Sequence, residues 1–203
     1  MTAPSGSQAE PNGGERPRRA DALRNRRAIV DAAIRVLADR PGASMAEIAT
    51  ACGMARATLY RHFADRNDLV TAIQIQATDA GAAALADADL DSGSATDALL
   101  RAVRALVGVG DRYRLLASEA ALSPEVLERR PAVAGRLFTV VERGQRDGEF
   151  RTDMLPHWIV AALAAQLVLA LREMAAGNLT QQQAAERVTS MLIDGVAAGE
   201  AGG

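Results

Sequence analysis

The chain has 203 residues, of which 49% are hydrophobic, 24% charged and only 3% aromatic. This hydrophobic fraction is too high for an intrinsically disordered chain, and 17 glycines and 7 prolines are too few for a collagen-like or low-complexity polymer. The formal net charge is −2, yet residues 1–66 hold 11 arginines against 7 acidic residues, while residues 67–203 hold 12 arginines against 18. This asymmetry suggests an anionic partner for the first part alone, with nucleic acid the leading candidate.

Cysteine content and targeting signals narrow the setting of the protein. The single cysteine, Cys52, excludes an intramolecular disulfide framework and a zinc site built on several thiolates. Residues 1–19 are polar and contain several prolines and glycines, so we interpret them as a flexible tail that ends in an arginine cluster, rather than as a signal peptide. The most apolar stretch, Trp158 to Leu171, is interrupted by Gln166 and is expected to be too short to span a membrane. These features predict a cytoplasmic protein with no membrane partner.

The first part of the chain predicts three helices. Alanine, the best helix former, accounts for 44 residues, which favours an all-α fold. Apolar residues recur at helical spacing over residues 23–37, and this helix is expected to end before Pro41-Gly42. Ser44-Met45-Ala46-Glu47 has the sequence of a capping box and predicts the start of a short second helix. Gly53 permits a tight turn, and Ala55 to Phe63 is predicted to be the third helix.

Helix caps and breakers divide the rest of the chain. Asp65 is predicted to cap a helix that runs to about Ala88, and Asp87 to Ser94 is interpreted as a connecting loop. Further helix starts and stops are expected at Ser94, Ser123-Pro124, Pro131, Gly148, Pro156, Gly177-Asn178 and Thr180. The sequence therefore predicts an all-α protein of about nine helices.

The second and third predicted helices, joined by a glycine turn, match the plan of a helix-turn-helix that reads DNA. Leu59 and Phe63 are expected to face inward, which turns polar and basic side chains outward toward a DNA groove. The alternative is an ordinary helical corner, because many helical proteins join short helices through glycine.

Specific residues in this part stand at fixed spacing along the chain. They are Arg27 to Ala33, Ser44 to Ala49, Gly53, Thr58-Leu59-Tyr60-Arg61-His62-Phe63, Arg66 and Leu69. Together they closely resemble the N-terminal domain of the TetR family, over about residues 24–72. The resemblance implies an all-helical homodimer, in which residues 20–66 bind DNA and a larger domain, residues 67–198, binds a small molecule that releases the DNA.

The same resemblance implies contacts to the phosphate backbone of DNA. It gives this role to Ser44 at the start of the second helix, to Thr58, Tyr60 and His62 in the recognition helix, and to Arg66 at the next helix start. Tyr60 also fits the role physically, because a tyrosine on a polar helix face has little core to fill and its hydroxyl is a good phosphate donor. His62 has no cysteine or carboxylate companions at metal-ligand spacing, so we do not interpret it as a metal ligand.

Three further positions vary in the family with the operator sequence, and they hold Arg56, Ala57 and Arg61. Arginine can pair bidentately with guanine, so Arg56 and Arg61 are predicted to read bases, with a phosphate contact as the alternative for each. Arg27 is predicted to contact the DNA backbone from the first helix, and a solvated arginine is an equal alternative. Ala55 departs from the family pattern, because a Ser or Thr usually caps the recognition helix at this position.

Residues from about 90 onward contain no recognisable motif. A helix from Pro156 to Ala176 is apolar around most of its circumference and is expected to bury two faces. It is predicted to form a four-helix bundle with the final helix and with the same two helices of a second subunit, as in similar regulators. Burial within a single chain is the alternative.

A small-molecule pocket is expected between the helices that include Leu99 to Leu116 and Val133 to Val141. Tyr113, Phe138 and Trp158 are its candidate wall residues, because aromatic residues are scarce in this chain and common in apolar pockets. Ordinary core packing is the alternative for each of them.

These observations predict a homodimeric transcriptional repressor that binds double-stranded operator DNA and is released by a small molecule. An enzyme needs a catalytic constellation, but the sequence has no nucleophile elbow, zinc-protease motif or phosphate-binding glycine loop, and His62 and His157 are far apart. We therefore expect no catalytic residues, no bound metal and no cofactor. A helical scaffold for partner proteins and a transcriptional activator are the alternatives that the sequence leaves open.

Overall fold

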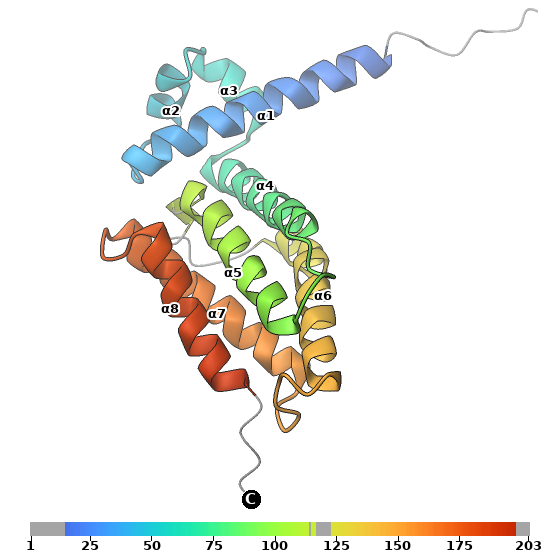
Figure 1. Ribbon diagram of the computed structural model, residues 1–203. Helices are drawn as coiled ribbons and strands as arrows, with labels where there is room; N and C mark the ends of the chain where they lie inside the picture. The colour runs from blue at the N-terminus through green and yellow to red at the C-terminus, as the bar shows by residue number, and fades with distance from the viewer. Residues whose placement is uncertain (1–14, 114, 117–122, 198–203) are drawn as a thin grey trace, which may run out of the picture.

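The computed structural model describes residues 15–113, 115–116 and 123–197. Within these ranges the chain forms eight α-helices, against about nine predicted, and one isolated β-bridge joins Phe150 to Ala197. The predicted all-α fold is confirmed. The helices are α1 (Glu15–Asp39), α2 (Met45–Ala51), α3 (Arg56–His62), α4 (Arg66–Asp87), α5 (Ala95–Arg112), α6 (Pro124–Arg146), α7 (Pro156–Ala175) and α8 (Gln181–Val196), as Figure 1 shows.

Two boundaries differ from the prediction. α1 begins at Glu15, so residues 15–19 are helical rather than part of the predicted tail, and residues 1–14 lie outside the described residues. Pro17 is compatible with this start, because N–H groups in the first turn have no acceptor within the helix. Pro131 was expected to separate two helices but lies inside α6. It is exposed there, so the carbonyl group that loses its helical partner can bind water instead.

The first three helices and the first turns of α4 enclose a small hydrophobic core. Its fully buried side chains come from all four helices, and the largest are Leu37, Ile48, Leu59, Phe63, Leu69 and Ile73. Tyr113 and Leu115, which follow α5 in the chain, are buried in the same core. The DNA-binding part predicted to end at residue 66 therefore shares its core with residues of the second part.

Helices α4 to α8 form a second body with its own core, in which α5 packs against α4, α6, α7 and α8 (Figure 1). Two glycines permit close approaches within it. A Cβ atom on Gly110 of α5 would overlap Leu171 of α7, and a Cβ atom on Gly144 of α6 would overlap the ring of Phe150. These contacts fix how α7 and the connection that precedes it sit against the bundle.

Long-range hydrogen bonds fix the start of α5. Arg101 donates to three carbonyl oxygens in the loop of residues 88–92, over distances of 2.6, 2.6 and 3.0 Å. The carboxylate of Glu149 accepts the backbone N–H groups of Thr96 (2.9 Å) and Ala95 (2.8 Å), and these bonds hold the pKa of Glu149 below its usual value. The first turn of α5 is thus anchored to a residue more than fifty positions later in the chain.

Helix α7 ends one residue before the predicted Ala176, and only one of its two apolar faces is buried in the single chain. Its 20 residues are apolar enough to cross a membrane by length and composition alone, but the core helix of a soluble protein passes the same test. α7 packs against α5, α6 and α8 through Ile159, Leu163 and Ala170. Its opposite face is exposed, and the large apolar side chains there are Trp158, Val168 and Leu169.

We predict that Gly144→Ala destabilises the protein by about 1–3 kcal/mol, because the added methyl group overlaps the buried Phe150 ring. Gly135, in the middle of the same helix, is the matched control, since nothing lies within 4 Å of a Cβ atom there. Gly135→Ala should stabilise by up to about 1 kcal/mol. Thermal unfolding followed by circular dichroism measures both, and equal shifts for the two variants would contradict the prediction.

Candidate nucleic-acid interface

Helix α2 is fixed at its start by a capping box. The Ser44 hydroxyl oxygen accepts the Glu47 N–H (3.3 Å), and the Glu47 carboxylate accepts the Ser44 N–H (2.8 Å) and hydroxyl (2.7 Å). These bonds lower the pKa of Glu47 from its usual value. Ser44 is exposed, as a phosphate contact requires, but its hydroxyl proton already has an acceptor in Glu47. A DNA phosphate that accepts this hydroxyl proton must therefore replace the hydrogen bond from Ser44 to Glu47.

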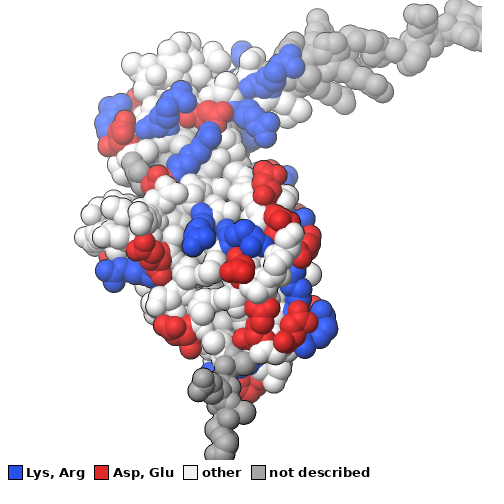
Figure 2. All heavy atoms as spheres, in the orientation of Figure 1, with Lys and Arg blue, Asp and Glu red and all other residues white. Residues whose placement is uncertain are grey.

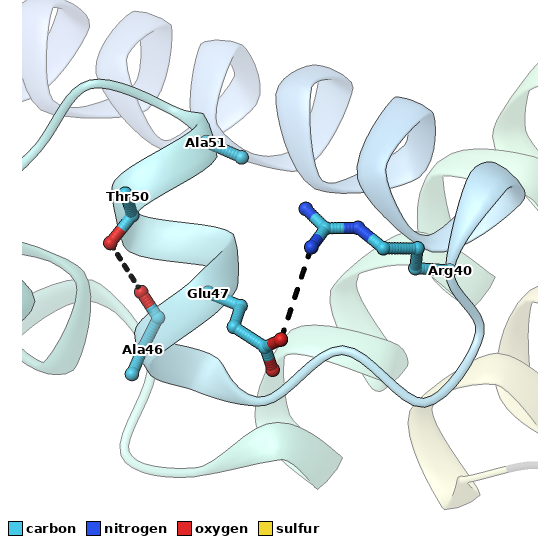
Figure 3. Close-up of a pocket in the computed structure, with 5 residues that line it drawn as sticks. All are labelled: Arg40, Ala46, Glu47, Thr50 and Ala51. Carbon is cyan, nitrogen blue, oxygen red and sulfur yellow. Dashed lines mark hydrogen bonds and ion pairs between the residues drawn. The ribbon is translucent and has the colours of Figure 1, made fainter.

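Beside α2 lies a shallow hollow of about 290 Å³, drawn in Figure 3. Arg40, directly after α1, and Glu47 of α2 face each other across it with a nitrogen to oxygen distance of 3.9 Å. The remaining lining side chains are short, namely Ala46, Thr50 and Ala51. The side chains on this face of α2 are therefore short and allow another molecule to approach closely. This suits the first helix of a helix-turn-helix, since that helix crosses the DNA backbone.

Helix α3 presents the predicted recognition residues on one exposed face. Leu59 and Phe63 are fully buried, and they place the opposite side of the helix in solvent. Thr58 and His62 are half-buried at the edges of that face. The exposed residues are Arg56, Ala57, Tyr60 and Arg61, with Tyr60 47% exposed. Ala55 supplies no side-chain cap to the helix.

The turn that leads into α3 has the geometry that the sequence predicted. Gly53 has a φ of +66°, which lies in the left-handed region that favours glycine. The Gly53 N–H donates to the Thr50 carbonyl (3.0 Å) and the Met54 N–H to the Ala49 carbonyl (3.0 Å). α2 and α3 are thereby held at a fixed angle to one another.

The two remaining predicted DNA contacts lie in different environments. Arg27 of α1 is exposed, whereas Arg66 at the start of α4 is half-buried. One guanidinium nitrogen of Arg66 donates to the Pro41 carbonyl (2.9 Å) and ties α4 to the turn between α1 and α2. Arg66 therefore also has a structural task. In Figure 2 arginines predominate at the end of the molecule formed by α1 to α3, and acidic side chains are denser over the bundle.

A polar contact between the helix-turn-helix and the bundle was missed by the sequence reasoning. Asp31 of α1 accepts hydrogen bonds from Gln76 of α4 (2.7 Å) and from Arg112, the last residue of α5 (2.7 Å). The guanidinium of Arg112 also lies over the ring of Tyr113, 5.6 Å from its centroid. Nothing in the local sequence marks this cluster, because Asp31 and Arg112 are 81 residues apart.

The three predicted pocket residues do not come together, which corrects the expectation of a shared wall. Tyr113 is buried in the core of the helix-turn-helix part, because the chain turns toward that core at the end of α5. Phe138 packs against the core of the bundle, and Trp158 is 63% exposed on α7. A hollow of about 750 Å³ lies instead between α5 and α8, lined by Arg104, Val107, Thr180, Gln181, Gln182, Ala185, Glu186 and Thr189.

Comparison with known proteins identifies the family. The model of the N-terminal domain of bacterial regulatory proteins of the tetR family matches residues 29–73. The HTH-type transcriptional repressor LfrR of Mycolicibacterium smegmatis is 30% identical over 175 residues, which cover 85% of this chain and 90% of the repressor. The chain belongs to the TetR family. It is accordingly a DNA-binding transcriptional regulator with an N-terminal helix-turn-helix domain.

Solved structures of the TetR family have the same fold. The crystal structure of LfrR from Mycobacterium smegmatis in complex with proflavine superimposes with a TM-score of 0.69 at 29% identity, covering 85% of this chain and 96% of that one. A putative TetR-family regulator from Rhodococcus sp. also gives a TM-score of 0.69, at 20% identity, covering 84% and 97% of the two chains. At 20% identity, the similarity to the Rhodococcus structure is evidence for the fold alone.

We predict that Arg56→Ala reduces affinity mainly for the preferred DNA sequence, by about 1–3 kcal/mol, because a bidentate contact to guanine is lost. Tyr60→Phe should weaken binding to preferred and scrambled duplexes alike, since a phosphate contact carries no sequence information. Fluorescence anisotropy with both duplexes measures this, and Arg104→Ala in α5 is the control for loss of an exposed arginine. Equal losses on both duplexes for Arg56→Ala would assign that residue to phosphate.

Proposed function

We propose that the protein is a homodimeric repressor that binds operator DNA through α3 of each subunit and leaves it when a small molecule binds the helical bundle. The observation that carries the proposal is the exposed face of α3, which sets Arg56, Tyr60 and Arg61 outward from a buried anchor in a chain of the TetR family. In this proposal the protein acts in the cytoplasm and has no enzymatic activity.

The dimensions of α3 suit the major groove. An α-helix with its side chains is about 10–12 Å across, which matches the major-groove width of about 12 Å, and the seven residues of α3 make it about 10 Å long. Residues at the start of a recognition helix usually contact base edges, which assigns base reading to Arg56 and Ala57. Arg61 can read a base or hold a phosphate from the other end. Ser44, Thr58, Tyr60 and His62, with Arg27 and Arg66 beside them, are proposed to hold the phosphate backbone.

The exposed apolar face of α7 supports a dimer. Trp158, Val168 and Leu169 of α7 and Met191 of α8 are each between 48% and 64% exposed, and the two helices pack side by side. Exposed apolar patches of this kind mark interaction surfaces. A second copy related by a two-fold axis would cover the patch and complete a four-helix bundle.

A small aromatic cation is the first effector class to test. The relative LfrR has a solved structure with proflavine, and the similarity covers 85% of this chain. The second part of this chain, residues 67–203, has 18 acidic residues against 12 arginines, and that balance favours a cationic ligand. Repression rather than activation is proposed because LfrR is named a repressor.

We predict that Leu169→Glu abolishes the dimer, because a charged side chain is placed in the apolar face of α7. Leu127→Glu is the matched control, since Leu127 is similarly exposed but lies on α6. Sedimentation equilibrium measures the oligomeric state, and the Leu169→Glu variant should also lose affinity for a palindromic operator. A monomeric wild type would contradict the proposed dimer.

The proposed function as a whole is tested by selecting duplexes from a random library with the wild-type protein and titrating the selected complex with proflavine. We expect sequence-selective binding that weakens steeply with salt, and release of the duplex by the dye. Binding of the dye to free DNA is measured separately as the control. Failure to select any sequence would contradict operator reading, and selection without release would limit the revision to the effector.

A further inference from the structure

One side chain of α1 contacts both segments that follow the recognition helix. The guanidinium carbon of Arg26 lies 4.6 Å from the centroid of the Phe63 ring, directly after the end of α3. One of its nitrogens lies 3.8 Å from Oδ1 of Asp68, in the first turn of α4. Arg26 therefore links α1 to two neighbouring segments much later in the chain, the end of α3 and the start of α4.

Asp68 closes the turn between α3 and α4 on the other side of this contact. Its Oδ2 accepts the Ala64 N–H (3.0 Å), and its own N–H donates to Oδ1 of Asp65 (2.9 Å). The two carboxylate oxygens thus have different partners, since one holds the turn and the other faces Arg26.

The recognition helix needs such support because it cannot hold its own position. It has only seven residues, and Ala55 gives it no side-chain cap. A helix of this length is unstable alone, so its orientation depends on its buried anchors, Leu59 and Phe63. Arg26 covers the Phe63 ring and therefore restrains the anchor that directly follows α3.

We propose that Arg26 is a positioning residue for DNA reading, which orients the recognition helix through Phe63 and Asp68 without contacting DNA itself. The inference rests on the proposed operator binding. Its neighbour Arg27 provides the contrast, because Arg27 is exposed and has no partner among the described residues, whereas the Arg26 guanidinium is engaged by a ring and a carboxylate. The adjacent arginines have different tasks, one internal and one toward the phosphate backbone.

The experiment compares Arg26→Met with Arg27→Met, on a duplex selected by the wild type and on its scrambled counterpart, over a series of salt concentrations. Arg26→Met should lose about tenfold in affinity for the selected duplex and less than about threefold for the scrambled one, with the salt slope unchanged. Arg27→Met should weaken both duplexes and reduce the salt slope by about one. Arg26→Lys, which keeps the charge, should restore most of the selected affinity.

Two further measurements separate positioning from general loss of structure. Asp68→Asn keeps an oxygen for the Ala64 N–H but removes the charge, so adding it to Arg26→Met should cause little additional loss. Hydrogen exchange in the free protein should speed up over residues 56–64 in Arg26→Met but not in Arg27→Met.

A reduced salt slope, equal losses on both duplexes, or unchanged exchange over residues 56–64 in Arg26→Met would overturn the positioning role. If the wild type selects no duplex, the proposed function fails, and the exchange measurement still decides whether Arg26 restrains α3.

Discussion

The burial of Leu59 and Phe63 is the constraint on which the proposed DNA-binding face depends. A seven-residue helix lies below the length at which hydrogen bonds repay the entropy of nucleation, so α3 takes its conformation and its orientation from tertiary contacts. Both side chains are fully buried among residues of α1, α2 and α4, and the exposed face that holds Tyr60 follows from that burial. The orientation of the proposed recognition helix is therefore set by a small hydrophobic core and not by the helix itself.

The same core extends into the bundle, which gives the two parts of the molecule a shared structure. Tyr113 and Leu115 from the end of α5 are buried in it, and α4 supplies residues to both cores. The hydrogen bonds from Gln76 and Arg112 to Asp31 add a polar contact at the same junction. Any displacement of the end of α5 must repack the core that orients α3, because close-packed interiors transmit small shifts rather than absorb them. In the proposed function, a ligand that displaces the end of α5 would act on α3 through this shared core.

Local chemistry was predictable from the sequence, and long-range polar contacts were not. The caps at Ser44, Asp65, Ser94 and Thr180 are set by residues three positions apart, so their patterns are visible in the sequence and each has its expected hydrogen bond. The contacts of Arg26, Arg66 and Arg112 join residues between 25 and 81 positions apart. A long flexible arginine leaves no periodic signal, and an exposed and an anchored arginine look alike in the sequence. The small number of aromatic residues did not indicate where each would lie. Tyr113 is buried in the core of the helix-turn-helix part, whereas Trp158 is exposed on α7.

Helix α7 shows why apolar composition alone does not identify a partner. A core helix, a membrane span and a dimer interface all have such a composition, and only the packing separates them, because Ile159 and Leu163 face the bundle while Trp158 and Leu169 face outward. In the proposed dimer this outward face fixes the distance between two recognition helices, and half-sites lie about 34–36 Å apart, one turn of DNA. Each subunit can hold α3 correctly and still fail to bind if that spacing changes. In the proposed dimer, a rotation of each subunit about the α7–α8 interface would weaken DNA binding, because both recognition helices must fit the DNA at the same time.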